Sequence, residues 1–170
     1  RKGSAGESFG RMRAWHGQFG MFVRALAYML SHGGDGLRQV AEDAVLNANY
    51  ILSGIKEKYH VPYKGTCMHE VLCDDHFLKD IEITTLDVAK SLIDEGYHPM
   101  TIYFPLTAHG AMLIEPTETE SRQTLDRFIE ALNRIADRAR SGEANGLRLS
   151  PLHAPRRRLD ETRAARQPTL

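Results

Sequence analysis

Apolar residues recur at helical spacing in several parts of the chain. The clearest case lies between 37 and 55, where they follow steps of three and four and form one stripe, which predicts an amphipathic helix. The stripe consists of Leu37, Val40, Ala41, Ala44, Ala48, Ile51, Leu52 and Ile55. The preceding stretch, 19–31, is apolar on all sides and predicts a buried helix that ends at Gly33 and Gly34.

Two further helices follow from capping signals. The first begins with Thr84 or Thr85 as N-cap and ends at Gly96. The second follows Pro116, where Thr117 and Glu120 fit a capping box in which each side chain satisfies a free backbone N–H. The box explains the dense Thr and Glu residues after Pro116 as the beginning of a helix. Glu115 lies outside the box and needs another explanation.

Three short segments rich in β-forming residues predict strands, at 66–75, 98–105 and 111–116. With the helices, they predict an α+β fold with a small, largely antiparallel sheet covered by helices. We expect 1–18 to be a lead-in segment from a missing large domain and 19–141 to be the helix-covered domain. We expect 142–170 to be an extended tail rich in Arg and Pro, ordered only where it lies on another surface.

Size and composition narrow the class of protein. The 170 residues suit one domain, and the 22 basic and 22 acidic residues balance. No apolar run approaches the roughly 20 residues of a membrane span, so we expect no membrane association. The first residue is not Met, which suggests that the chain begins inside a longer protein.

The two cysteines indicate the redox environment. Cys67 and Cys73 fall on one predicted strand, too far apart to pair, so we expect reduced thiols and a cytoplasmic location.

The end of the chain is basic. No aromatic residues interleave with its arginines for base stacking, so we expect no nucleic-acid partner but a solvated or subunit-contacting tail. The arginines are Arg156, Arg157, Arg158, Arg163 and Arg166.

Histidines provide the candidate chemistry. His69 and Glu70 resemble the start of a zinc-protease motif, but position 73 is Cys, and neighbours on a strand point to opposite faces. No metal site is therefore predicted, and a metal-dependent hydrolase built on His69, His98 and Glu115 is the weakest hypothesis. His98 precedes Pro99 at a loop-to-strand junction, where site residues are common. Gln18 lies between two glycines before a helix, where backbone N–H groups can hold an anion.

Several strings in collinear order resemble the C-terminal part of glycine dehydrogenase (decarboxylating). That family is the pyridoxal-phosphate-dependent P-protein of the glycine cleavage system, and the likeness is greatest to its second subunit. The strings include GLRQVAEDAVLNANYIL, MHEVL, TLDVAKSLIDEGYHPMTIYFPL and LIEPTETESRQTLDRFIEAL. The HP-x-T motif followed by EPTETE at this spacing is a specific feature of the resemblance. The chain departs from the usual family residues at Gln18, Val71 and Met100.

The resemblance implies the small C-terminal domain of a fold-type-I pyridoxal-phosphate-dependent transferase. The family's Schiff-base lysine follows a histidine, which none of the six lysines here does; they are Lys2, Lys56, Lys58, Lys64, Lys79 and Lys90. We therefore expect no catalytic residue in this chain and no covalent attachment of the cofactor to it. The full-length enzyme would use pyridoxal 5'-phosphate to decarboxylate glycine.

The resemblance also implies partners and site residues. The aminomethyl group would pass to the lipoyl carrier H-protein, and the chain would assemble with the first subunit as an oligomer. The residues expected to line the cleft are His98, His69, Gln18 and Glu115. The alternative is a stand-alone, non-catalytic binding or subunit-docking module.

Overall fold

A computed structural model describes residues 16–168, and the chain divides into two compact units, Arg1–Gln39 and Val40–Leu170. The described part contains, in order, α1 (Phe19–Ile55), β1 (Val71–Cys73), the short 3-10 helix η1 (Asp75–Leu78), α2 (Thr85–Asp94), β2 (Thr101–Ile102), β3 (Met112–Ile114), α3 (Arg122–Arg140), α4 (Ala144–Leu149) and α5 (Glu161–Arg166). Within the described residues, no helix has the length and apolar character needed to span a bilayer.

Helix α1 is interrupted where the sequence predicts a break. Gly33 has φ 65° and ψ −177°, which is outside the helical region and separates two helical stretches. The first stretch was predicted to be buried, and this prediction is wrong: Phe19 is 77% and Leu30 is 75% exposed. The described residues of the first unit form one helix and its lead-in, and so they provide no second layer to cover its apolar sides.

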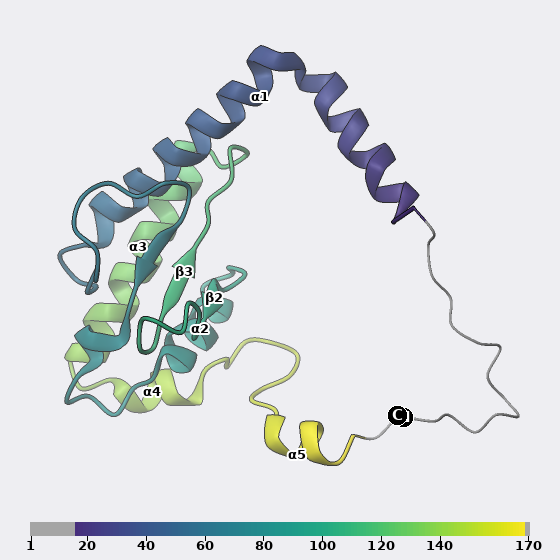
Figure 1. The fold of residues 1–170 in the computed structure, drawn as a ribbon. Coiled ribbons are helices and arrows are strands. Elements are labelled where there is room, and N and C mark those ends of the chain that lie inside the picture. Colours follow the sequence, from purple (N-terminus) through teal and green to yellow (C-terminus); the bar gives the residue numbers. More distant parts are fainter. Residues whose placement is uncertain (1–15, 169–170) are drawn as a thin grey trace, which may run out of the picture. The chain divides into compact units, whose positions relative to one another are not determined.

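The three strands form an antiparallel sheet in the order β1-β3-β2 (Figure 1). Val71 pairs with Ile114 on one side of the central strand, and Thr101 pairs with Leu113 on the other. This confirms the predicted small antiparallel sheet, although each strand is shorter than the segment that predicted it. Buried positions alternate along β1 and β3, so Val71 and Ile114 face the core while Leu72 and Leu113 are half-buried.

The core lies between the sheet and the helices, as the apolar stripes predict. On α1, Ala48, Ile51 and Ile55 are buried, and α3 contributes a matching buried face. A Cβ at Gly54 would come within 2.8 Å of Ile129 on α3, so glycine permits the close approach of the two helices. The α+β fold with helices covering the sheet is therefore confirmed in the second unit (Figure 1).

Helix α2 begins as predicted. Thr84 is its N-cap, and the hydroxyl of Thr84 accepts a hydrogen bond from the N–H of Asp87. In return, Asp87 accepts the N–H of Thr84 through Oδ2 at 2.7 Å, which completes a capping box. The helix ends before Gly96, whose φ of 86° suits glycine.

Helix α3 begins later than the sequence predicts, and the Thr117–Glu120 capping box is wrong. Ser121 is the N-cap, and its Oγ accepts the N–H of Thr124 at 3.2 Å. Residues 117–120 form a turn instead, in which the N–H of Glu120 bonds to the carbonyl of Thr117. That carbonyl also accepts a hydrogen bond from Nδ2 of Asn47 at 2.9 Å, so a contact with α1 favours the turn.

The stretch 142–170 was predicted to be an extended tail, but it is not extended throughout. It contains α4, where Leu147 is fully buried, and α5, where no residue is buried. The segment between them, which we call the strap (150–158), is tied to α2. Asp87 is 4% exposed and bonds to Nη2 of Arg158 at 2.5 Å. Local sequence patterns do not predict this contact, because it joins residues 71 positions apart.

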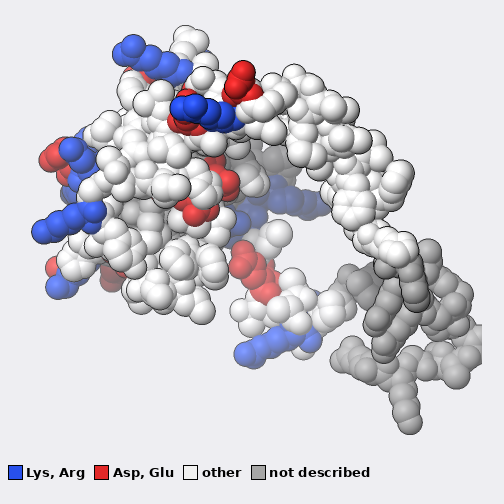
Figure 2. Space-filling model, turned by 45° about the horizontal axis from the view of Figure 1, so that its top comes forward, with Lys and Arg blue, Asp and Glu red and all other residues white. Residues whose placement is uncertain are grey.

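Charged side chains of both signs are interspersed on the face shown in Figure 2. Ion pairs at the surface of the second unit include Arg134 with Glu95 at 2.7 Å and Arg148 with Glu82 at 3.0 Å. Exposed pairs of this kind contribute at most about 1 kcal/mol each to stability. Folding of this unit therefore depends chiefly on its apolar core.

We predict that Ser121→Ala lowers the free energy of unfolding by about 1 kcal/mol, because it removes the N-cap hydrogen bond of α3. Thr117→Ala is the matched control, since within residues 16–168 the Thr117 hydroxyl has one hydrogen bond, to the Thr119 hydroxyl at the surface. Urea denaturation followed by circular dichroism measures both variants. An equal loss in the two would contradict the assignment of Ser121 as the cap.

A second prediction concerns the strap at low pH. Asp94 is partly desolvated, which raises its pKa. The backbone N–H groups of His153 and Leu152 and the Ser150 hydroxyl together outweigh this effect and lower the pKa below its usual value. A lowered pKa in the folded state means that the contact stabilises the strap fully above the usual pKa and is lost as the pH falls through the folded value.

The measurement is a pH titration of the amide signals of Leu152 and His153 by NMR. We expect a midpoint below 3.8, the ordinary value for an aspartate. Asp94→Asn should abolish this transition. A midpoint at or above the ordinary value would show that the hydrogen bonds to Asp94 do not hold the strap.

Candidate functional site

A pocket of about 420 Å³ opens at the end of the sheet where β1 and β2 begin and β3 ends. Residues from several segments between 51 and 128 contribute to its wall. The lining residues are Ile51, Glu70, Tyr97, His98, Pro99, Met100, Thr101, Leu113, Ile114, Glu115, Pro116, Glu120, Thr124, Leu125 and Phe128.

Two of the residues predicted from the sequence meet in this pocket. His98 lies just before β2, with Pro99 fixing the approach to the strand, and Glu115 follows β3 and precedes the buried Pro116. Both line the pocket and both are exposed. His98 and Glu115 thus both line this pocket, and their role in a cleft of the enzyme stays a prediction.

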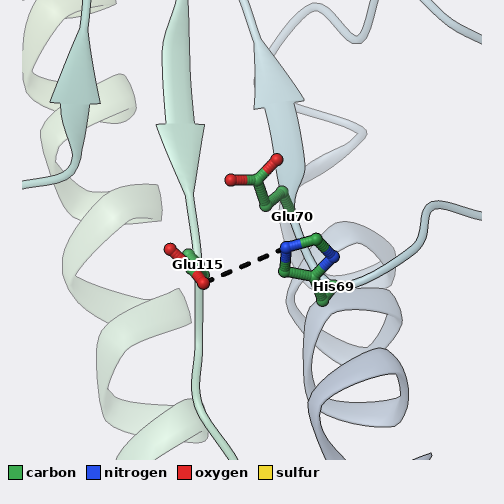
Figure 3. Close-up of side chains that lie close together, drawn as sticks. All are labelled: His69, Glu70 and Glu115. Carbon is green, nitrogen blue, oxygen red and sulfur yellow. Dashed lines mark ion pairs between the residues drawn. The ribbon is translucent and has the colours of Figure 1, made fainter. Parts of the chain in front are cut away.

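His69 also lies beside this site, in a way that the sequence argument excluded. Its Nε2 is 4.0 Å from Oε1 of Glu115, and donor atoms of His69, Glu70 and Glu115 all lie within 4.8 Å of one another (Figure 3). The prediction that His69 and Glu70 point to opposite faces of a strand is wrong. β1 begins only at Val71, and His69 lies in a bend before it, so the alternation of a strand does not apply.

The pocket combines carboxylates with an apolar wall. Glu70, Glu115 and Glu120 supply three carboxylates, and none of the lining residues is Lys or Arg. The apolar side includes Phe128, which meets Tyr97 edge-on with ring centroids 5.1 Å apart. Such a site favours a cation or a positively charged group and repels a phosphate.

Sequence reasoning missed Glu70 as a lining residue and assigned Glu120 to a helix cap. The antiparallel register could have revealed Glu70, because continuing the pairing of Val71 with Ile114 by one step sets Glu70 opposite Glu115. Gln18, the remaining candidate, belongs to the first unit, where its carbonyl accepts the N–H of Met21 at 2.9 Å. Its role stays a prediction.

The two thiols have separate environments. Cys73 is buried in β1, and burial raises its pKa to about 12. Cys67 lies in the loop before β1, not on the strand as predicted, and partial burial raises its pKa as well. Asn49 holds the Cys67 backbone through its amide, with Oδ1 accepting at 3.0 Å and Nδ2 donating at 2.8 Å. Raised pKa values disfavour the thiolate, so neither cysteine suits nucleophilic catalysis.

Comparison with known proteins gives consistent results. The family model "Glycine dehydrogenase, C-terminal domain" matches residues 40–150. "Probable glycine dehydrogenase (decarboxylating) subunit 2" of Caulobacter vibrioides is 63% identical over 164 residues, covering 96% of this chain and 31% of the relative. The protein of the same name from Alkaliphilus oremlandii is 50% identical over 159 residues, covering 94% of this chain and 32% of the relative. The chain thus spans about a third of the length of these relatives.

Among solved structures, the fold resembles that of a glycine decarboxylase (P-protein) of the glycine cleavage system in inhibitor-bound form. The TM-score is 0.51 at 23% identity, over 64% of this chain and 24% of the other. At this level of identity the likeness concerns the fold alone, and it agrees with the small α+β domain predicted from the sequence. The family match extends over most of the second unit and includes every residue of the pocket. The chain therefore belongs to the glycine dehydrogenase C-terminal domain family.

Proposed function

We propose that this chain is the C-terminal domain of a pyridoxal-phosphate-dependent glycine decarboxylase of the glycine cleavage system. The larger protein would decarboxylate glycine and transfer the remaining aminomethyl group to the lipoyl H-protein. One observation carries the proposal: 96% of the chain aligns at 63% identity with a probable glycine dehydrogenase (decarboxylating) subunit 2. The first subunit of that enzyme, in an oligomer, is the partner that follows from the proposal.

The pocket in this chain does not fit the cofactor. Pyridoxal phosphate needs a lysine for its aldehyde and donors for its phosphate. The lining residues include no Lys or Arg, and three carboxylates would repel the phosphate. We therefore assign the cofactor to the part of such a protein that this chain does not cover. No step of the reaction is assigned to the cofactor in this pocket.

The contribution of this chain would be to bind and orient polar groups at the mouth of a cleft. The imidazole of His98 can donate or accept a hydrogen bond, and its backbone is restrained by Pro99. Glu115 lines the same pocket and can accept a hydrogen bond from an ammonium group, which glycine carries. We also propose a cytoplasmic location, supported by two cysteines that are both free.

A chimera tests the proposal. The C-terminal part of the Caulobacter relative that aligns with this chain would be replaced by this chain and combined with the first subunit, H-protein, glycine and pyridoxal phosphate. We expect glycine-dependent exchange of carbon dioxide within about tenfold of the unaltered relative, a barrier difference of about 1.4 kcal/mol. The relative truncated before the same point is the control and should be inactive. A folded but inactive chimera would contradict the proposal.

His98→Asn in the active chimera tests the role of the pocket. We predict that turnover falls at least about tenfold while the thermal midpoint is unchanged, because the lost imidazole orients a group during the reaction and does not support the fold. His153→Asn is the matched control, since His153 lies on the strap and does not line the pocket. If only the thermal midpoint moves in His98→Asn, the residue is structural.

A further inference from the structure

The cluster of His69, Glu70 and Glu115 lies where two strand ends meet. His69 and Glu70 come directly before β1, and Glu115 comes directly after β3 (Figure 3). One donor atom from each lies within 4.8 Å of the other two. The donors are one imidazole nitrogen and two carboxylates, and they come from two segments that only the β1–β3 pairing brings together.

The carboxylates of this pocket have no Lys or Arg partner that balances their negative charge within residues 16–168. Continuing the register places Glu70 opposite Glu115, and like charges directly opposite each other on antiparallel strands destabilise the pairing. Glu120 adds a third carboxylate to the same pocket. Among residues 16–168, the ion pairs offer Glu115 only His69 at 4.0 Å and offer Glu70 and Glu120 no Lys or Arg. A bound cation would convert this repulsion into attraction.

The donor set selects the kind of cation. Imidazole nitrogen with carboxylate oxygen suits divalent metals of the zinc or manganese class better than magnesium or calcium, which prefer oxygen alone. Metal–donor bonds of about 2.1 Å set neighbouring donors roughly 3.0–3.4 Å apart. Donor atoms that lie up to 4.8 Å apart need to approach one another by up to roughly 1.4–1.8 Å. The side chains of His69 and Glu115 are 52% and 58% exposed, so rotation about their side-chain bonds can provide this change.

We propose that His69, Glu70 and Glu115 bind a divalent cation of this class at the mouth of the pocket. The ion joins the residues before β1 to the residue after β3 and so extends a ladder that is only three residues long. Its remaining coordination positions are open to water or to a ligand in the pocket. This proposal does not rest on the proposed enzymatic function, because its test measures ion binding to the chain and not the reaction, although Glu115 is named in both.

The test uses the 170-residue chain and Mn²⁺ as the probe. Mn²⁺ coordinates thiols poorly, which reduces interference from the cysteines. We expect loss of the free Mn²⁺ signal in electron paramagnetic resonance with one ion bound per chain. At tenfold excess over Kd, the thermal midpoint should rise by roughly 3–6 °C relative to EDTA. Zn²⁺ should act likewise, and Ca²⁺ should act weakly.

Variants locate the ion. Glu115→Gln and His69→Ala should each weaken Mn²⁺ binding at least about tenfold. Glu120→Gln removes the same charge from the same pocket but no proposed ligand, so it should weaken binding less than about threefold. In EDTA, Glu115→Gln should not lower the thermal midpoint, because it removes like-charge repulsion; this separates loss of the ion from loss of the fold.

Three results would overturn the proposal. The first is the absence of Mn²⁺ binding and of any thermal shift at 1 mM ion, roughly the weakest affinity of extracellular cation sites. The second is equal weakening by Glu120→Gln and Glu115→Gln, which indicates a diffuse acidic surface. The third is unchanged binding in His69→Ala, which removes the imidazole from the site.

Discussion

The antiparallel pairing of β3 with β1 and β2 is the constraint on which the second unit depends. Its register points Val71 and Ile114 into the core, where α1 and α3 cover them. A slip of one residue would turn these side chains toward solvent and replace them with Leu72 and Leu113, and the core would no longer match the two helices. The same register sets Glu70 beside Glu115, so the hydrophobic core and the polar pocket are fixed by one set of backbone hydrogen bonds.

Local signals predicted most of the secondary structure. The stripe of α1 and the capping box of α2 depend on residues at most four positions apart, and both are present. The beginning of α3 depends on a distant residue. Thr117 and Ser121 both offer a capping hydroxyl, and the bond from Asn47 to the Thr117 carbonyl holds residues 117–120 in a turn. A contact that spans 70 positions has no signature in a local pattern.

The sequence predicts those residues of the candidate site that flank a predicted strand. His98 and Glu115 stood out because each flanks a predicted strand beside a proline, and both line the pocket. To predict that Glu70 lines the pocket, one must know the register of the sheet, which depends on the paired strands and not on one strand alone. To predict that His69 lies beside Glu115, one must know where β1 begins. Strand ends are the boundaries that sequence patterns define least well.

Asp87 links two regions through the two oxygens of one carboxylate. Oδ2 accepts the backbone N–H of Thr84, and Oδ1 accepts the guanidinium of Arg158. With a side chain only 6% exposed, it would be a buried anion without a cation if the strap detached. Release of the strap thus removes charge compensation from Asp87, which completes the capping box of α2. The strap and the first turn of α2 should therefore open and close as one cooperative unit, so the strap contributes to the stability of the domain although it contains no helix or strand.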